Sequence, residues 1–287
     1  TATGLPDPGP VTSYGLPFLR AAGEIAAVIA VGSFLLAAFF VPPQESGVLD
    51  VDGYRALRTG TVATGAWAVC AALLVPLTLS DVSGQPVNRL LDPVRVWQLT
   101  GLVATANAWL WTAILAALLT LAAIPVLRWG FTPFLLGGAL VTLLPLVLTG
   151  HSATGGSHDL ATNALFIHLM AGALWAGGLL ALLAHVLRGG GYTELAARRF
   201  SAVALWCFVA MAFSGVINAL VRVRPADLLG TDYGRLLLAK VAALVALGVL
   251  GWLQRRRGIA AIRTDPTARA PQLWFTFAEA VVFALTF

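Results

Sequence analysis

Residues 161–187 read ATNALFIHLMAGALWAGGLLALLAHVL and contain no Lys, Arg, Asp or Glu. An uninterrupted apolar run of this length exceeds the roughly 20 residues that a helix needs to cross a bilayer. Similar runs occupy most of the chain, at 18–41, 56–79, 99–127, 131–150, 200–221 and 235–253, with another beginning near 272. The sequence therefore predicts an all-α, polytopic transmembrane helix bundle of about eight spans joined by short loops.

The composition agrees with a membrane protein. Hydrophobic residues make up 59% of the chain and charged residues 11%, and the mean hydropathy is +0.85. A soluble domain with this balance would expose a mostly apolar surface, whereas lipid solvates such a surface well. A β-barrel is disfavoured because the apolar runs are unbroken rather than alternating. We therefore expect the lipid bilayer to surround the protein.

The net charge of +5 does not indicate a nucleic-acid partner, because the basic residues flank the spans as cytoplasmic loops require. No P-loop, HExxH or glycine-rich nucleotide-binding motif occurs in the chain. These motifs carry the common hydrolase and nucleotide-driven chemistry. We therefore expect that the protein is not an enzyme and binds no nucleic acid.

Arginine placement predicts the orientation in the membrane. Most of the 18 basic residues follow the first, third, fifth and seventh spans: Arg55, Arg58, Arg128, Arg188, Arg198, Arg199, Arg255, Arg256, Arg257, Arg263 and Arg269. Basic connections face the cytoplasm. The 151–160 loop has no Lys or Arg, so alternation places it on the extracytoplasmic side of a plasma membrane.

The chain divides, on this interpretation, into three N-terminal spans over 1–129 and a second transmembrane domain over 130–287. It begins at Thr1, and its last apolar run stops at Phe287. That run is short for a span. We therefore expect the sequence to be part of a longer polypeptide, cut inside its last span.

Three of the four histidines, His151, His158 and His168, lie at the predicted outer side. Imidazole is a ligand for copper and zinc. A helix continuous from Ser157 would separate His158 from His168 by about 15 Å along its axis, too far to share one ion. A helix that starts near Thr162, under a folded-back loop, would permit one shared site. The alternatives are a graded path, or wet loop histidines with His168 bonded to a neighbouring helix.

A softer set of side chains lies deeper in the spans. Cys207, Met211, Ser214 and Asn218 follow an i, i+4, i+7, i+11 spacing and share one helix face. Thiolate and thioether are ligands that Cu(I) prefers, so these residues, together with Met170, could form an ion path. Ordinary core packing is the alternative interpretation.

Two acidic residues within or near apolar runs are further candidates, because ionisable groups inside a membrane are usually functional. Glu24 follows Arg20 by one turn and could pair with it, whereas Glu279 has no partner nearby in sequence. Separately, small residues such as Ala173 and Gly177 should allow another helix to approach closely.

Several motifs resemble the copper resistance protein D family. They are Gly150–His151–Ser152, His168–Leu169, Trp175–Ala176–Gly177–Gly178–Leu179, Arg199–Phe200–Ser201, Ser214–Gly215–Val216 and Thr231–Asp232–Tyr233–Gly234–Arg235–Leu236–Leu237–Leu238–Ala239–Lys240. They lie within 130–287. Some longer proteins of this kind continue into a CtaG-type cytochrome oxidase assembly domain.

The resemblance implies an inner-membrane protein that handles copper and moves it from the outside toward the cytoplasm or to an oxidase. It implies that His151 and His168 are ligands for Cu(I) or Cu(II), with His158 as a third candidate. A periplasmic copper donor or a cytochrome oxidase subunit is the implied partner.

Two other functions remain open at this point. A b-type haem would need two histidines on different helices at matching depth, and His168 and His185 share one apolar run. His151 could pair with His168 only if the end of the fourth span dips inward. An assembly or scaffold protein that does not transport copper is the other alternative.

Overall fold

The computed structural model describes residues 8–90, 92–149 and 158–222, with helical pairs at 234–235, 238–239, 241–242, 245–246 and 248–249. The helices are α1 (Pro10–Leu35), extended by the π-helical turn η1 (Leu36–Phe40), α2 (Val51–Ser83), α3 (Pro93–Thr100), α4 (Ala104–Ala123), α5 (Thr132–Thr142), α6 (Leu144–Thr149), α7 (His158–Leu187) and α8 (Thr193–Arg222). Two 3-10 turns, η2 (Val87–Leu90) and η3 (Trp129–Phe131), complete the described elements.

Six helical segments are long and apolar enough to cross a membrane within the described residues: Pro10–Phe40, Val51–Ser83, Ala104–Ala123, Trp129–Thr149, Phe166–Leu187 and Thr193–Ile217. They coincide with the first six predicted spans. The predicted class, an all-α polytopic membrane protein, is thereby confirmed. The described spans number six rather than eight, because the predicted seventh falls mostly, and the eighth entirely, outside the described residues.

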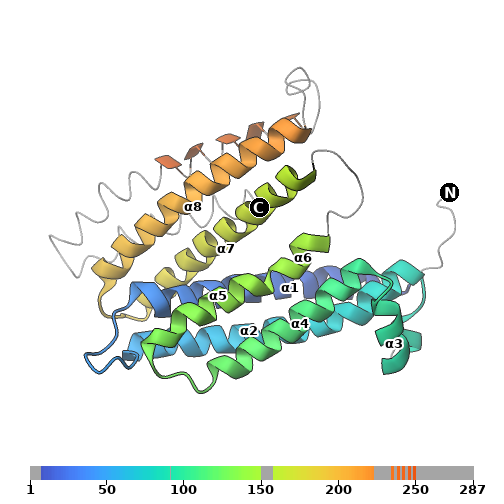
Figure 1. Ribbon diagram of the computed structural model, residues 1–287, viewed down its shortest axis with the longest axis horizontal. Coiled ribbons are helices and arrows are strands. Elements are labelled where there is room, and N and C mark those ends of the chain that lie inside the picture. The colour runs from blue at the N-terminus through green and yellow to red at the C-terminus, as the bar shows by residue number, and fades with distance from the viewer. Residues whose placement is uncertain are drawn as a thin grey trace.

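Helix α1 is the central element of the bundle. It packs against α2 on one side and α7 on another, and it also contacts α5. Helix α4 packs on α2, and α8 packs on α7. Figure 1 shows α7 and α8 as an inclined pair that meets α1 near one end of the molecule and diverges from it toward the other.

Local sequence explains where several helices begin and end. The side chain of Asp50 accepts a hydrogen bond from the Asp52 backbone N–H and caps the start of α2. Gly84 ends the same helix with φ 63°, a conformation that glycine adopts without steric cost. Asp92 caps α3 in the same way, by accepting from the Val94 N–H at 3.1 Å.

The contact between α1 and α7 is a crossing of two glycines. A Cβ on Gly177 would lie 2.5 Å from the Val28 carbonyl oxygen and 2.8 Å from the Gly32 nitrogen. A Cβ on Gly32 would overlap the Gly177 carbonyl group. The two backbones touch because neither residue has a side chain. Close approach at Gly177, expected from the small residues around it, is present, and Gly32 is the partner.

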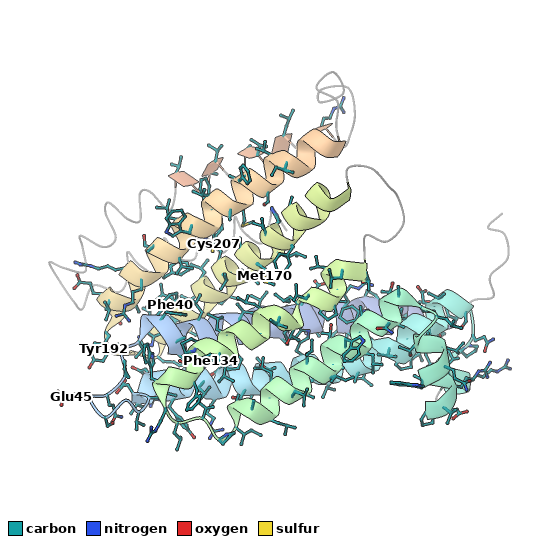
Figure 2. All side chains as sticks on the ribbon, in the orientation of Figure 1. Phe40, Glu45, Phe134, Met170, Tyr192 and Cys207 are labelled. Atoms are coloured by element: carbon teal, nitrogen blue, oxygen red, sulfur yellow. The ribbon has the colours of Figure 1, made fainter. Side chains whose placement is uncertain are left out.

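The connections after the first, third and fifth spans meet at one end of the bundle. Leu49 N–H donates to the Leu127 carbonyl at 2.9 Å, and Trp129 N–H donates to the Gly47 carbonyl at 3.0 Å. The Arg199 guanidinium donates to the Phe39 carbonyl at 2.8 Å. Figure 2 shows Phe40, Glu45 and Tyr192 together at this end.

This end gathers Arg55, Arg58, Arg128, Arg188, Arg198 and Arg199, and we call it the arginine-rich end. The alternation of the spans and the grouping of these arginines agree with the topology predicted from the sequence. Which compartment this end faces stays a prediction.

Gly32→Ala should lower the free energy of unfolding in detergent by about 1–3 kcal/mol, because the methyl group separates two touching backbones. Thermal or denaturant unfolding of the purified protein measures the change.

The matched control is Gly137→Ala on α5, where an added Cβ meets nothing within 4 Å. There the higher helix propensity of alanine should make the change neutral or stabilising, by up to about 1 kcal/mol. Equal effects of the two substitutions would contradict the glycine crossing.

Candidate functional site

The residue at which α7 begins determines the distance between two candidate histidines, His158 and His168. The helix begins at His158 and runs unbroken through His168. Ten residues of helical rise separate them by about 15 Å along the axis. The structure therefore has the continuous helix considered from the sequence, in which His158 and His168 are too far apart to share one ion. The His158 side chain, and His151 with its loop, lie outside the described residues.

His168 is tied to the neighbouring helix. Its Nδ1 lies 3.0 Å from the Ser214 hydroxyl oxygen on α8. The Ser214 hydroxyl in turn donates to the Met211 carbonyl at 3.1 Å. Ser214 is fully buried and His168 is half-buried. The bond to a neighbouring helix, one of the roles considered for His168, is therefore present.

This pair of contacts favours one histidine tautomer. Because the Ser214 hydroxyl is placed to donate to the Met211 carbonyl, we infer that its oxygen accepts from Nδ1–H of His168. The neutral ring then carries its lone pair on Nε2. Metal-binding histidines are commonly oriented by such a bond from the second ring nitrogen.

The two sulfur-containing side chains of α8, Cys207 and Met211, face the buried core of the bundle. Cys207 is 5% exposed and Met211 is 3% exposed, and both belong to the core cluster that includes Trp175. Trp175 packs edge-on against Phe208, with ring centroids 6.1 Å apart.

The predicted shared face of α8 is thus present over 207–214, where Cys207, Met211 and Ser214 are all buried. Cys70 and Cys207 are both free thiols. The Asn218 side chain lies outside the described residues.

Met170 lies on the face of α7 that carries Gly177, whereas Glu24 is offset from Gly32 by almost a quarter turn around α1. At about 100° per residue, Met170 points within about 20° of Gly177 around α7. Glu24 points within about 40° of Val28 and about 80° of Gly32 around α1. Both residues precede the crossing by about two turns. They therefore share a depth in the part of the molecule where α1 and α7 diverge (Figure 1).

Glu24 is exposed. The possible ion pair between Glu24 and Arg20, both of which are described residues, is not formed. Glu279, the second acidic candidate, lies outside the described residues. Within the described part of the chain, no group of three or more His, Cys, Asp or Glu side chains is placed to hold a metal ion.

His185, near the end of α7, has a structural role. Its ring is 5% exposed, and its Nε2 lies 2.7 Å from the Gly191 carbonyl oxygen. The Gly191 N–H donates to Asp52 Oδ2 at 2.8 Å. This junction between α2 and the α7–α8 connection was not predicted. Its only sequence signal is the run 189–191, where Gly189 has φ 72°.

Two family models match the chain. The N-terminal domain model of the copper resistance protein D-like proteins matches residues 11–159. The copper resistance protein D model matches residues 194–287. The first match alone covers more than half of the chain and includes α1, from its second residue, through α6. The division at residue 130 stays a prediction.

Three relatives have similar sequences. The copper transport protein CutJ of Bacillus subtilis is 28% identical over 224 residues, which are 71% of this chain and 41% of CutJ. The inner membrane protein YebZ of Escherichia coli is 26% identical over 226 residues, 76% of each chain. The uncharacterized protein ML1998 of Mycobacterium leprae is 26% identical over 177 residues, 61% of this chain and 27% of that protein.

This chain therefore spans less than half the length of CutJ and of ML1998. No solved structure matches it.

Ser214→Ala should change the tautomer of His168, because Nδ1–H loses the oxygen that accepts its proton. Nitrogen-15 NMR of histidine-labelled protein in detergent distinguishes the two neutral forms. We expect the Nδ1–H form in the unaltered chain and a smaller share of it in the variant.

Ser83→Ala is the control, since it removes a hydroxyl from α2 that donates to the Leu79 carbonyl. An unchanged His168 spectrum in Ser214→Ala would show that the 3.0 Å contact does not set the tautomer.

Proposed function

We propose, because this chain belongs to the copper resistance protein D family, that it carries copper into and across the inner membrane of a bacterium. Its six described spans and its family make it a copper-related membrane protein. Copper is the cargo in this proposal and no covalent chemistry is required, so the protein is a transporter rather than an enzyme.

The orientation supports entry at the end opposite the arginines. Positively charged connections are retained in the cytoplasm, which makes the arginine-rich end the cytoplasmic one. The loop that carries His151, and the start of α7 at His158, then face the extracytoplasmic side. A periplasmic copper donor is the partner that we propose for this side.

The observation that carries the proposal is the bond from His168 to Ser214. It holds an imidazole at the junction of α7 and α8, within a membrane-spanning helix, and favours the tautomer whose lone pair is on Nε2. Two soft side chains, Cys207 and Met211, are buried on the same helix as Ser214. Imidazole followed by thiol and thioether suits copper, above all Cu(I).

The distances along α7 favour a series of sites over a single cage. His158 and His168 are separated by about 15 Å along one helix, so an ion would contact them in turn. Outer histidines would receive the ion, His168 would hold it within the membrane, and the buried face of α8 would pass it on. Met170 and Glu24 lie at a depth close to His168 and extend the set of side chains available to an entering ion.

His168→Ala should weaken Cu(I) binding to the purified protein by at least about tenfold, since loss of a ligand or of its support commonly costs 10–100-fold. Ser214→Ala should weaken it about tenfold through misorientation of the ring. Competition with a chromophoric Cu(I) chelator under anaerobic conditions measures both changes.

The matched control is His185→Gln, which alters the histidine at the other end of the same helix and retains a donor toward Gly191. Its Cu(I) affinity should equal that of the unaltered chain. If the His168 and His185 variants bind Cu(I) equally well, His168 is not a ligand.

Cys207→Ser and Met211→Leu should slow copper uptake into proteoliposomes severalfold while leaving the protein folded, because each replaces a soft sulfur by a group of similar size. Cys70→Ser is the control, since Cys70 lies on α2, away from α7 and α8. Uptake rates that fall equally in the Cys70 and Cys207 variants would exclude a specific path along α8.

A further inference from the structure

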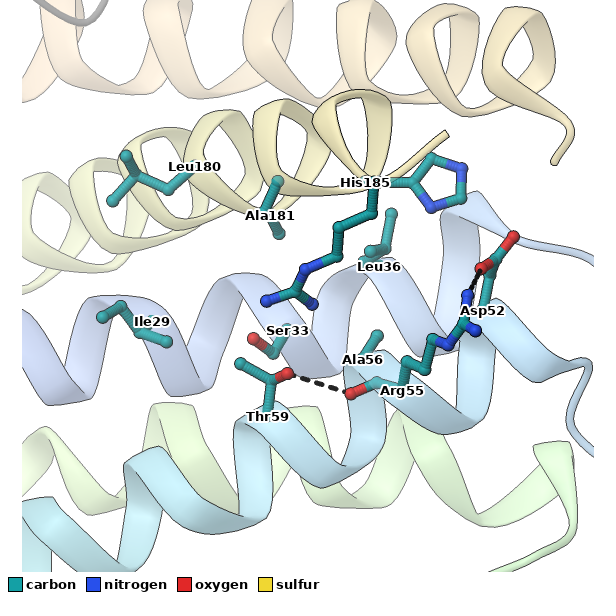
Figure 3. A pocket seen from close by; sticks show the side chains of 12 residues that line it. Ile29, Ser33, Leu36, Asp52, Arg55, Ala56, Thr59, Leu180, Ala181 and His185 are labelled. Carbon is teal, nitrogen blue, oxygen red and sulfur yellow. Dashed lines mark hydrogen bonds and ion pairs between the residues drawn. The ribbon is translucent and has the colours of Figure 1, made fainter. Parts of the chain in front are cut away.

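A pocket of about 300 Å³ opens between α1, α2 and α7 at the arginine-rich end (Figure 3). Helix α1 forms its floor, and α2 and α7 form its two sides. It is lined by polar and apolar side chains: Ile29, Ser33, Leu36, Asp52, Arg55, Ala56, Thr59, Leu180, Ala181, Ala184, His185 and Arg188. The copper proposal uses none of these residues.

The charged residues that line this pocket leave a net positive charge. Arg55 contributes from α2 and Arg188 from just past the end of α7. The carboxylate of Asp52 is already engaged, by the Arg55 guanidinium at 3.3 Å and by the Gly191 N–H at 2.8 Å. One guanidinium charge is therefore in excess over the carboxylate, and the lining favours an anion.

Asp52 also orders the mouth of the pocket. It holds the Arg55 guanidinium in place and fixes the backbone at Gly191, three residues after Arg188. Hydroxyl groups of Ser33 and Thr59 add to the polar lining. Guanidinium groups bind phosphate oxygens well because their N–H groups form a planar fork.

The other part of the pocket is apolar. Figure 3 shows Ile29 and Leu180 at the end away from Asp52 and Arg55. Ile29 precedes Leu36 by seven residues, so the apolar lining extends about 10 Å along α1 toward the middle of the membrane. Leu180 is 42% exposed on the outside of the described bundle, where a transmembrane helix contacts lipid.

We propose that this pocket binds one anionic phospholipid, with its phosphate at Arg55 and Arg188 and the upper part of an acyl chain along Ile29 and Leu180. The polar end faces the level of the headgroups and the apolar end faces the acyl region. Basic residues at the cytoplasmic end of spans attract anionic lipids of that leaflet. A free phosphate ion would use the arginines alone and would gain nothing from the apolar end.

The test measures lipid binding to the full chain in detergent by native mass spectrometry. Phosphatidylglycerol and phosphatidylcholine with identical acyl chains are compared, and inorganic phosphate and glycerol phosphate are added as competitors. We expect retention of one phosphatidylglycerol, little retention of phosphatidylcholine, and no displacement by either soluble phosphate at millimolar concentration.

Two substitutions test the polar end and the apolar end of the pocket separately. Arg188→Gln should weaken phosphatidylglycerol binding by about tenfold, in line with the loss of one hydrogen bond between charged groups. Ala181→Trp should weaken it by filling the apolar part. Arg128→Gln is the matched control, because it removes an exposed arginine of the same end that does not line the pocket.

Equal binding by the Arg188 and Arg128 variants would overturn the site, since only general charge attraction would then act. If inorganic phosphate displaced the bound phosphatidylglycerol, the ligand of this pocket would be a soluble anion and not a phospholipid. Arg188→Gln should leave the Cu(I) affinity unaltered, so the lipid test is independent of the copper proposal. The copper proposal is tested by the His168 variant.

Discussion

The backbone contact between Gly32 and Gly177 is the constraint on which the rest of the arrangement depends. It joins the layer of α1, α2 and α4 to the pair of α7 and α8, and it does so close to the arginine-rich end. Because the helices touch there and diverge beyond it, Glu24 and Met170 remain apart from the tight core. The same contact places α7 beside α1 and α2, so that a pocket forms between them. The pocket between α1, α2 and α7 thus follows from one crossing of two residues without side chains.

The two proposals occupy opposite ends of α7 and use different chemistry. On this side of α7, an imidazole on α7 and a thioether and a thiol on α8 lie in succession, a combination suited to a soft metal ion. Toward its end, guanidinium groups and aliphatic side chains meet, a combination suited to an amphipathic anion. The bond between His168 and Ser214 and the bonds that Asp52 accepts from Arg55 and Gly191 have the same physical role. Each holds a functional or interfacial group in one orientation before any ligand arrives.

Apolar length and arginine placement were enough to predict the six described spans and their alternation, because a bilayer imposes both patterns directly on the sequence. The close approach at Gly177 was predictable from small residues, and the common face of Cys207, Met211 and Ser214 from helical periodicity. The partner Gly32 was not, since a glycine in a span does not specify which helix it meets. The link from Asp52 to Gly191 joins residues 139 positions apart, and local patterns carry no information on such pairs. For His158 and His168, the sequence left two helix starts open, and the observed start selects one of them.

The connections at the arginine-rich end are tied together by main-chain groups: Leu49 to Leu127, and Trp129 to Gly47. Such bonds are made by the peptide unit that nearly every residue has in common, so they are indifferent to the side chains around them. The loops can therefore drift in sequence during evolution without loosening the bundle. Proline is the exception at positions 49 and 129, because it has no N–H to donate. Any other residue at these two positions would leave both main-chain bonds of this end in place.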